Sequence, residues 1–292
     1  MREFVYERPG TVEEAVAAMR SGDARALAGG TDLVPQLREG RRGAGHIIDI
    51  KHIPDVTAIS VLPDGGVSIG AAATATAVAR HAAVVARYPA VTQSAQLIGG
   101  VQVQNRASLG GNICNAAPSA DGVPALICYG ARALIAGPAG KRELPVEEIF
   151  VGPGRTRLAA GELLVAIQLP PAERRSAAAY LRFTPRREMD IAVVGSGVWL
   201  RLGEDGAIAE ARVVLASVAP TPIHAPTAER RLMGERPSRA LFEDAGRLAA
   251  QDARPISDTR GSADYRRTLV AVLTTRALAD CSRQLDVEVA VQ

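Results

Sequence analysis

The spacing of apolar and polar residues predicts a helix soon after the N-terminus. Its apolar face is formed by four residues at helical spacing, Val12, Ala15, Val16 and Met19. Thr11 and Glu14 form a T-x-x-E capping box at the start of this helix. Gly22 stands where a residue in the left-handed conformation would end it. We therefore expect a short amphipathic helix that ends just before Gly22.

Two short apolar runs follow this helix and predict strands at Arg25–Ala28 and His46–Ile50. The first run leads into a glycine pair, Ala28-Gly29-Gly30-Thr31-Asp32, which predicts a turn. The order of strand, glycine turn, helix and strand suits a nucleotide-binding subdomain. We expect this α/β subdomain to cover about residues 1–52.

A second unit, about residues 53–172, mixes strands and helices. The pattern predicts strands at 66–71, 131–136 and 163–169, and helices at 76–88, 90–98 and 121–129. A second glycine pair, Ser108-Leu109-Gly110-Gly111-Asn112, is expected to form a loop here. The dipeptide Pro170-Pro171 favours extended chain over helix, so we expect a linker at 170–175.

Beyond about residue 178 the pattern changes from strands to helices. Strands are predicted at 179–184, 191–202 and 211–218, with a hairpin turn at 203–206, and helices at 227–233, 238–253 and 262–284. An antiparallel sheet followed by helices predicts an α+β domain over residues 178–285. The expected fold class is therefore α/β plus α+β.

Composition narrows the classes of protein that fit. Hydrophobic residues make up 47% of the 292 residues, but no apolar run reaches the length of a membrane span. The segment Met1–Val5 lacks the order of charges and apolar residues of a signal peptide, so we expect a cytoplasmic protein. The net charge is only +3 and no basic stripe is interleaved with aromatic residues, which makes nucleic acid a poor partner.

The cysteines and histidines argue against a metal site in this chain. Cys114, Cys128 and Cys281 are far apart and form no C-x-x-C pattern, whereas an iron–sulfur cluster needs about four grouped thiolates. The four histidines are scattered singly, which does not suit zinc. The three cysteines are therefore expected to be buried thiols in a reducing compartment.

The two glycine pairs carry the candidate chemistry. Glycine lets the backbone approach a ligand closely, and successive N–H groups can then face an anion. Thr31 and Ser108 add hydroxyl groups, and Asn112 adds an amide. Neither a P-loop nor the G-x-G-x-x-G pattern occurs. Either glycine pair alone would be an ordinary turn. Together they predict two loops that bind the diphosphate of a dinucleotide such as FAD. The sequence identifies no catalytic residue.

The second glycine pair belongs to a longer motif, NRASLGGNICNAAPSADGVPAL at 105–126. Further motifs follow one another along the chain: AGGTDL at 28–33, IIDIKHIP at 47–54, GELLVAIQLP at 161–170, RREMDIAVVGSGV at 186–198 and RGSADYRRTLV at 260–270. With these motifs the chain resembles the FAD-binding medium subunit of the molybdenum hydroxylases. That family includes xanthine dehydrogenase and aerobic carbon monoxide dehydrogenase.

The resemblance implies a fold and a cofactor site. The fold would be an FAD-binding domain of the vanillyl-alcohol-oxidase type, with subdomains at about 1–52 and 53–172, followed by the C-terminal α+β domain. Both glycine loops would hold the FAD pyrophosphate. Asp121 would lie near the ribose or adenine, Arg182 near the isoalloxazine, and Leu163, Leu164 and Tyr180 against the ring. Three alternatives stay open: Asp121 as a helix N-cap, Arg182 as a surface residue, and Leu163 and Leu164 as core residues of a strand.

The resemblance also implies partners. A large subunit would hold molybdopterin and a small subunit two [2Fe–2S] clusters, in a heterotrimer or a dimer of heterotrimers. The FAD would then pass electrons to NAD, a quinone or oxygen. The chain lacks the cysteine-bearing insertion of relatives that reduce 4-hydroxybenzoyl-CoA, and Thr31 replaces the histidine typical of the carbon monoxide enzyme. Two alternatives are a self-contained flavin oxidase of the vanillyl-alcohol-oxidase type and a flavin-free structural subunit.

Overall fold

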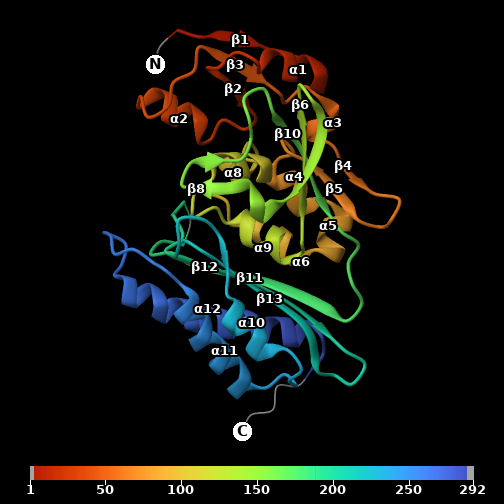
Figure 1. Ribbon diagram of the computed structural model, residues 1–292, viewed down its shortest axis with the longest axis vertical. Helices are drawn as coiled ribbons and strands as arrows, with labels where there is room; N and C mark the ends of the chain where they lie inside the picture. Colours follow the sequence, from red (N-terminus) through yellow and green to blue (C-terminus); the bar gives the residue numbers. More distant parts are fainter. Residues whose placement is uncertain (1–2, 188, 288–292) are drawn as a thin grey trace.

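The computed structural model describes residues 3–187 and 189–287. Glu188 of the motif at 186–198, and Met1 and Arg2 of the N-terminal segment, lie outside the described residues. Three units follow one another along the long axis of the molecule (Figure 1), each built around one main sheet. We call them the N-terminal unit (residues 3–50), the middle unit (53–169) and the C-terminal unit (176–287).

The N-terminal unit is a small parallel sheet with the strand order β1-β3-β2. Its strands are β1 (Val5–Glu7), β2 (Ala24–Leu27) and β3 (His46–Asp49), and its helices are α1 (Val12–Ala18) and α2 (Leu33–Arg38). The strands predicted at Arg25–Ala28 and His46–Ile50 are confirmed to within one residue. The pattern missed β1, which is an exposed edge strand.

The start of α1 was predicted correctly, and its end was not. Thr11 Oγ1 accepts a hydrogen bond from the Glu14 amide at 3.1 Å, and Glu14 Oε2 accepts one from the Gly10 amide at 2.7 Å. The helix ends at Ala18, before the predicted position, and Gly22 does not adopt a positive φ. The segment after Ala18 instead turns directly into β2, so no left-handed residue is needed to end the helix.

The middle unit contains an antiparallel sheet with the strand order β4-β5-β10-β6-β7. These strands are β4 (Ile59–Val61), β5 (Val67–Gly70), β10 (Leu163–Leu169), β6 (Arg132–Gly137) and β7 (Gly140–Pro145). The bounds of β10 match the prediction. A two-stranded hairpin of β8 (Phe150–Gly152) and β9 (Arg155–Thr156) precedes β10 and follows the short 3-10 helix Val146–Ile149.

The helices of the middle unit pack on its sheet. They are α3 (Pro54–Thr57), α4 (Ala75–Arg80), α5 (Ala82–Arg87), α6 (Pro89–Gln96), α7 (Val101–Gln104), α8 (Leu109–Asn115) and α9 (Gly122–Cys128). The single helix predicted at 76–88 is wrong, because His81 is extended at ψ 120° and separates α4 from α5. The break allows Val78 and Val84, which are both fully buried, to reach the same core.

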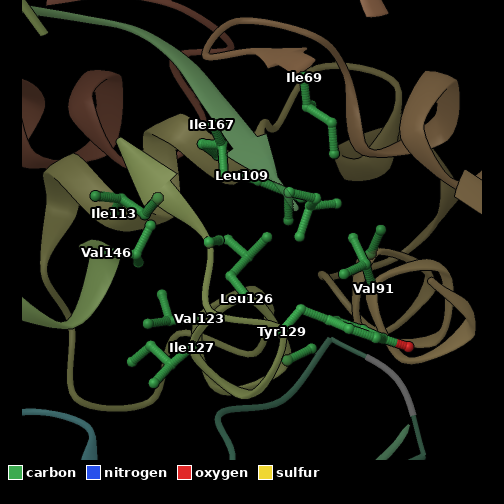
Figure 2. Packing of buried hydrophobic residues seen from close by; sticks show 14 of the residues in the cluster. Ile69, Val91, Leu109, Ile113, Val123, Leu126, Ile127, Tyr129, Val146 and Ile167 are labelled. Carbon is green, nitrogen blue, oxygen red and sulfur yellow. The ribbon is translucent and has the colours of Figure 1, made fainter. Parts of the chain in front are cut away.

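Residues of α8 and α9 occupy the centre of the largest core. Figure 2 shows Leu109 and Ile113 of α8 close to Leu126 of α9, with Ile69 and Ile167 of the sheet nearby. All five side chains are at most 1% exposed. A separate core joins α1 to β10 and β6 and thereby fixes the N-terminal unit on the middle unit.

The C-terminal unit is an antiparallel sheet covered by helices, as predicted. The strand order is β11-β12-β13-β14, with β11 (Ser176–Phe183), β12 (Val194–Leu202), β13 (Ile208–Ala216) and β14 (Ile223–His224). The helices are α10 (Pro226–Leu232), α11 (Arg239–Asp252) and α12 (Ala263–Gln284). The predicted turn at 203–206 is present, with Gly206 at φ +79°.

Strand β11 contacts both neighbouring layers through alternating side chains. Ala177 and Ala179 pack toward the helices of the C-terminal unit, whereas Ala178 and Tyr180 pack into the core of the middle unit. Helix α9 lies against β11, β12 and β13 from that second side, as Figure 1 also shows. Between β10 and β11 the chain crosses from the middle to the C-terminal unit at 170–175 without regular structure. The domain boundaries at 172 and 178 stay predictions.

Among the described residues, no helix combines the length and the apolar character that a membrane crossing requires.

Candidate functional site

A cavity of about 420 Å³ lies between the N-terminal and middle units. Its walls are β2, the glycine turn after β2, α2, α8 and the segment at 156–164. Most of the predicted binding residues line it: Ala28, Gly29, Gly30, Thr31, Asp32, Ser108, Gly110, Gly111, Asn112 and Leu164. The structure therefore brings both glycine segments and Leu164 to one cavity, and its size is in the range of cofactor sites.

The first glycine segment lies directly against the chain that leads into the second one. A Cβ atom at Gly29 would overlap the backbone carbonyl of Arg106, so only glycine fits there. Gly30 adopts φ +74° and turns the chain from β2 into α2. A Cβ at Gly110 would likewise overlap Ala71. These glycines are required because the backbones of distant segments meet here.

The second glycine segment is not the loop that the sequence predicted but the first turn of α8. Ser108 is the N-cap of this helix, and its Oγ accepts a hydrogen bond from the Gly111 amide at 3.0 Å. A Cβ at Gly111 would meet only this Oγ, at 3.2 Å, so the remaining side of Gly111 faces open space. Ser108 followed by apolar residues at 109 and 113 is a helix-start pattern that could have been recognised.

Polar atoms of α2 and α8 face the cavity. The side-chain Oδ1 of Asn112 is buried and accepts no hydrogen bond from the residues that the structure describes. Burial raises the pKa of the Asp32 carboxyl, and the charges of Arg42 and Arg41 oppose that rise. Gln36 Nε2 donates to Asn115 Oδ1 at 3.0 Å and links the two helices. Asp32 and the side chain of Asn112 line the cavity and offer polar groups to a ligand.

Two arginines that the sequence did not single out also line the cavity, Arg25 and Arg42. Arg25 donates to the carbonyl of Ala24 at 2.7 Å, and Arg42 approaches the carbonyl of Gly154 at 3.5 Å. Within residues 3–187 and 189–287, neither forms an ion pair with a carboxylate. Their charges are available to an anionic ligand. Arginine is so abundant in this chain that these two carried no signal of their own.

Three predicted residues lie outside the lining of the cavity: Leu109, Asp121 and Arg182. Leu109 is 1% exposed and belongs to the core beside α9. Leu164 is both a cavity residue and a core residue at 2% exposure, so its two interpretations are compatible. The roles of Leu109, Asp121 and Arg182 in cofactor binding stay predictions.

Asp121 and Arg182 contact each other across the boundary between the middle and C-terminal units. Arg182 Nη1 donates to Asp121 Oδ2 at 2.5 Å, and the Tyr180 hydroxyl donates to Asp121 Oδ1 at 2.9 Å. Asp121 is the N-cap residue of α9, as the alternative interpretation has it, although its side chain makes no capping hydrogen bond. The Arg182 side chain is only 6% exposed, so the alternative of a surface arginine is wrong.

The charge state of this pair follows from its surroundings. Burial raises the pKa of the Asp121 carboxyl to about 6, against the opposing effects of the Arg182 guanidinium and the Tyr180 hydroxyl. The Arg182 guanidinium beside it favours the ionised carboxylate, and the two side chains form an ion pair. The pair is a buried contact between the two units.

The cysteines carry no metal-binding arrangement in the part of the chain that the structure describes. Cys114, Cys128 and Cys281 are free thiols, and no three His, Cys, Asp or Glu side chains gather as metal ligands there. Cys114 lines the cavity, and burial raises the pKa of its thiol to about 12. This thiol is neutral at physiological pH and acts as a small apolar side chain.

A two-unit cavity with glycine backbone on one side and apolar strand residues on the other defines a dinucleotide-binding flavoprotein. Residues 2–172 match the family "FAD binding domain in molybdopterin dehydrogenase", and residues 179–281 match "CO dehydrogenase flavoprotein C-terminal domain". The residues present fit FAD, because both glycine segments, with the open side of Gly111, and the charges of Arg25 and Arg42 line one cavity.

Individual relatives agree with this match. The chain is 32% identical over 277 residues to a putative xanthine dehydrogenase FAD-binding subunit of Escherichia coli, covering 94% of each chain. It is 32% identical to the carbon monoxide dehydrogenase medium chain of Hydrogenophaga pseudoflava, covering 94% of this chain and 96% of that one. A solved carbon monoxide dehydrogenase from the latter organism superimposes with a TM-score of 0.92 at 31% identity, covering 97% and 98%.

The chain belongs to the family of FAD-binding subunits of molybdenum-containing hydroxylases and dehydrogenases. It is a subunit of an oxidoreductase, and FAD is its cofactor. The family resemblance and the fold class predicted from the sequence are thereby confirmed.

Proposed function

We propose that this chain holds FAD in the cavity between the N-terminal and middle units and relays electrons through it. The electrons would come from the [2Fe–2S] clusters of a partner subunit and leave to NAD, a quinone or oxygen. The observation that carries the proposal is the meeting of both glycine segments at one cavity in a chain of this family. Bound FAD supplies the capacity to accept electrons singly and to release them singly or in pairs.

The residues of this chain bind and orient the cofactor. The open side of Gly111 allows the diphosphate a close approach, and Gly29 and Gly30 keep the first glycine segment in its place at the cavity wall. Arg25 and Arg42 offset its negative charge, and Asn112 and Asp32 accept hydrogen bonds from its hydroxyl or amino groups. The apolar side chain of Leu164 excludes water from its end of the cavity. No residue of the chain is assigned a proton transfer.

The proposed partners are a small subunit with [2Fe–2S] clusters and a large subunit with molybdopterin. Support comes from the relatives whose names are "medium chain" of carbon monoxide dehydrogenase. The assembly we infer is a heterotrimer or a dimer of heterotrimers. The proposed compartment is the cytoplasm, because Cys114, Cys128 and Cys281 are free thiols.

Titration of the flavin-free chain with FAD tests the proposal. We expect binding at a ratio of one FAD per chain, seen as a change in the flavin spectrum. Gly111→Asp places a carboxylate at the open side of α8 and should weaken binding at least about 100-fold, because it adds like charge beside the diphosphate. Gly43→Asp is the matched control, since its Cβ meets nothing within 4 Å and it lies outside the cavity lining.

Three results would contradict the proposal. The first is a folded chain that does not bind added FAD, and the second is a Gly111→Asp variant that binds FAD with wild-type affinity. Reduction of the bound flavin by a small alcohol or hydroxy acid in the absence of other subunits would instead identify a self-contained oxidase.

A further inference from the structure

One wall of the cavity is a segment without helix, and we call residues 153–162 the strap. It includes the tip of the β8–β9 hairpin and the chain that leads into β10, which Figure 1 shows beside α8. Thr156, Leu158 and the residues at 159–162 line the cavity. Ala159 and Ala160 are also exposed to solvent, so the strap separates this part of the cavity from water. No hydrophobic core includes 159–162.

An ion pair between Arg142 and Glu162 connects the strap to the sheet behind it. Arg142 of β7 donates from Nε to Glu162 Oε1 at 2.6 Å and from Nη2 to Glu162 Oε2 at 2.7 Å. This is the bidentate geometry in which an arginine–carboxylate pair is strongest. Arg142 Nη2 also donates to the carbonyl of Arg157 at 3.2 Å, and Glu162 Oε2 accepts from the Ala159 amide at 2.8 Å. The pair thus holds the strap at its backbone at Arg157 and Ala159 and through the side chain of Glu162.

The remaining contacts of the strap are mainly in its hairpin part. Strand β9 pairs with β8, the Arg157 amide donates to the carbonyl of Ile149 at 2.8 Å, and Leu158 packs against the core of the middle unit. The Gly154 amide donates to the carbonyl of Ala116 at 2.9 Å, which attaches the hairpin tip to the end of α8. Gly161 adopts φ +81° and turns the chain toward β10. Residues 159–162 belong to no hydrophobic core, and such a segment opens at low free energy unless polar contacts hold it. The Arg142–Glu162 pair supplies those contacts, and the Glu162 side chain is only 13% exposed.

We propose that the strap retains the cofactor in the cavity and that Arg142 and Glu162 are positioning residues for it, an inference that rests on the proposed FAD site. Loss of the pair lets the strap move away from the cavity and opens an exit for bound FAD. The association step is less affected, because an open strap still admits the cofactor. The pair therefore controls the residence time of FAD more than the rate of its capture.

Release of FAD from the flavin-loaded full chain is the test, followed as flavin fluorescence after dilution. Arg142→Met and Glu162→Gln should release FAD about tenfold faster than wild type, the size expected for loss of a charge-assisted bidentate contact. Arg142→Lys keeps the charge without the bidentate geometry, so its rate of FAD release should lie between the rates of wild type and Arg142→Met. The matched controls are Arg132→Met and Glu143→Gln, which remove the more exposed pair on β6 and β7, at 3.1 Å and outside the cavity lining. They should release FAD at the wild-type rate.

Trypsin gives a second measurement, because Arg155 and Arg157 are exposed residues of the strap itself. Cleavage after them, located by mass spectrometry, should be faster in Arg142→Met and slower when FAD is bound. A purely structural role of the pair would not make strap cleavage depend on FAD. Wild-type release rates in Arg142→Met and Glu162→Gln, or equally fast release in the β6–β7 controls, would overturn the inference. Failure of the wild-type chain to bind FAD would instead overturn the proposed function.

Discussion

The cavity and the interface between the middle and C-terminal units are built in different ways. At the cavity, backbone meets backbone, and glycines stand where a Cβ atom would overlap another segment. At the interface, buried charges on side chains connect the units, with Asp121 between Tyr180 and Arg182. The first arrangement tolerates no added atom, and the second tolerates no removed charge. The two regions should therefore respond to opposite kinds of substitution.

The largest effect is expected at the interface. Asp121→Ala removes the acceptor of two hydrogen bonds, leaves the Arg182 guanidinium and the Tyr180 hydroxyl buried without this partner, and should lower the free energy of unfolding by about 3–5 kcal/mol. Urea denaturation followed by circular dichroism measures this loss. Asp280→Ala is the control, because its pair with Arg283 is more exposed and should contribute less than about 1 kcal/mol.

A double variant sharpens the argument about the buried pair. Asp121→Ala with Arg182→Met removes both charges, so most of the lost stability should return. If the double variant is as unstable as Asp121→Ala alone, the cost comes from lost packing rather than from an unpaired charge.

At the cavity, the smallest possible addition should be destabilising. Gly29→Ala forces a Cβ against the Arg106 carbonyl, so the backbones must separate, at a cost of about 1–3 kcal/mol. Because the two glycine segments then move apart, FAD affinity should fall together with stability. Gly43→Ala has free space around its Cβ and serves as the control in both measurements. Wild-type stability and affinity of Gly29→Ala would mean that the segments are not in contact in solution.

The difference between the two regions also explains what the sequence could predict. A glycine pair after a strand is a local signal, and the family motifs at 28–33 and 105–126 placed both cavity segments correctly. Asp121 and Arg182 are 61 positions apart, and nothing local in the sequence indicates that they meet. Arg142 and Glu162 meet only because β7 and the start of β10 lie in one sheet.

The errors in the predicted secondary structure have a tertiary cause. His81 interrupts a helix although the residues around it, mainly alanine and valine, favour a continuous one, because two short helices bury Val78 and Val84 better than one. The segment at 108–112 was interpreted as a loop because two glycines disfavour helix. In α8 close backbone packing of Gly110 on Ala71 outweighs that preference. Tertiary contact decides in both cases.

The smallest effect is expected at a second contact of the interface, around His224. His224 Nδ1 lies 2.7 Å from Glu229 Oε1, and Nε2 lies 2.9 Å from Glu147 Oε2 of the middle unit. The hydrogen bond to Glu229 raises the pKa of His224, burial opposes the rise, and the charges of Glu229 and Glu147 add to it. The protonated imidazole therefore joins the two units through two carboxylates.

The sign of the pH dependence follows from the raised pKa. A histidine whose pKa is higher in the folded chain stabilises it fully below the unfolded value of about 6.5, and this stabilisation is lost as the pH rises through the folded value. The free energy of unfolding of wild type should therefore be about 0.5 kcal/mol higher than that of His224→Gln at pH 6. This difference should disappear at high pH. Glu147→Gln removes only the carboxylate that the middle unit contributes, and it should reduce this pH dependence without abolishing it. A stability difference between wild type and His224→Gln that stays constant from pH 6 to alkaline pH would show that the contact does not depend on the charge of the imidazole.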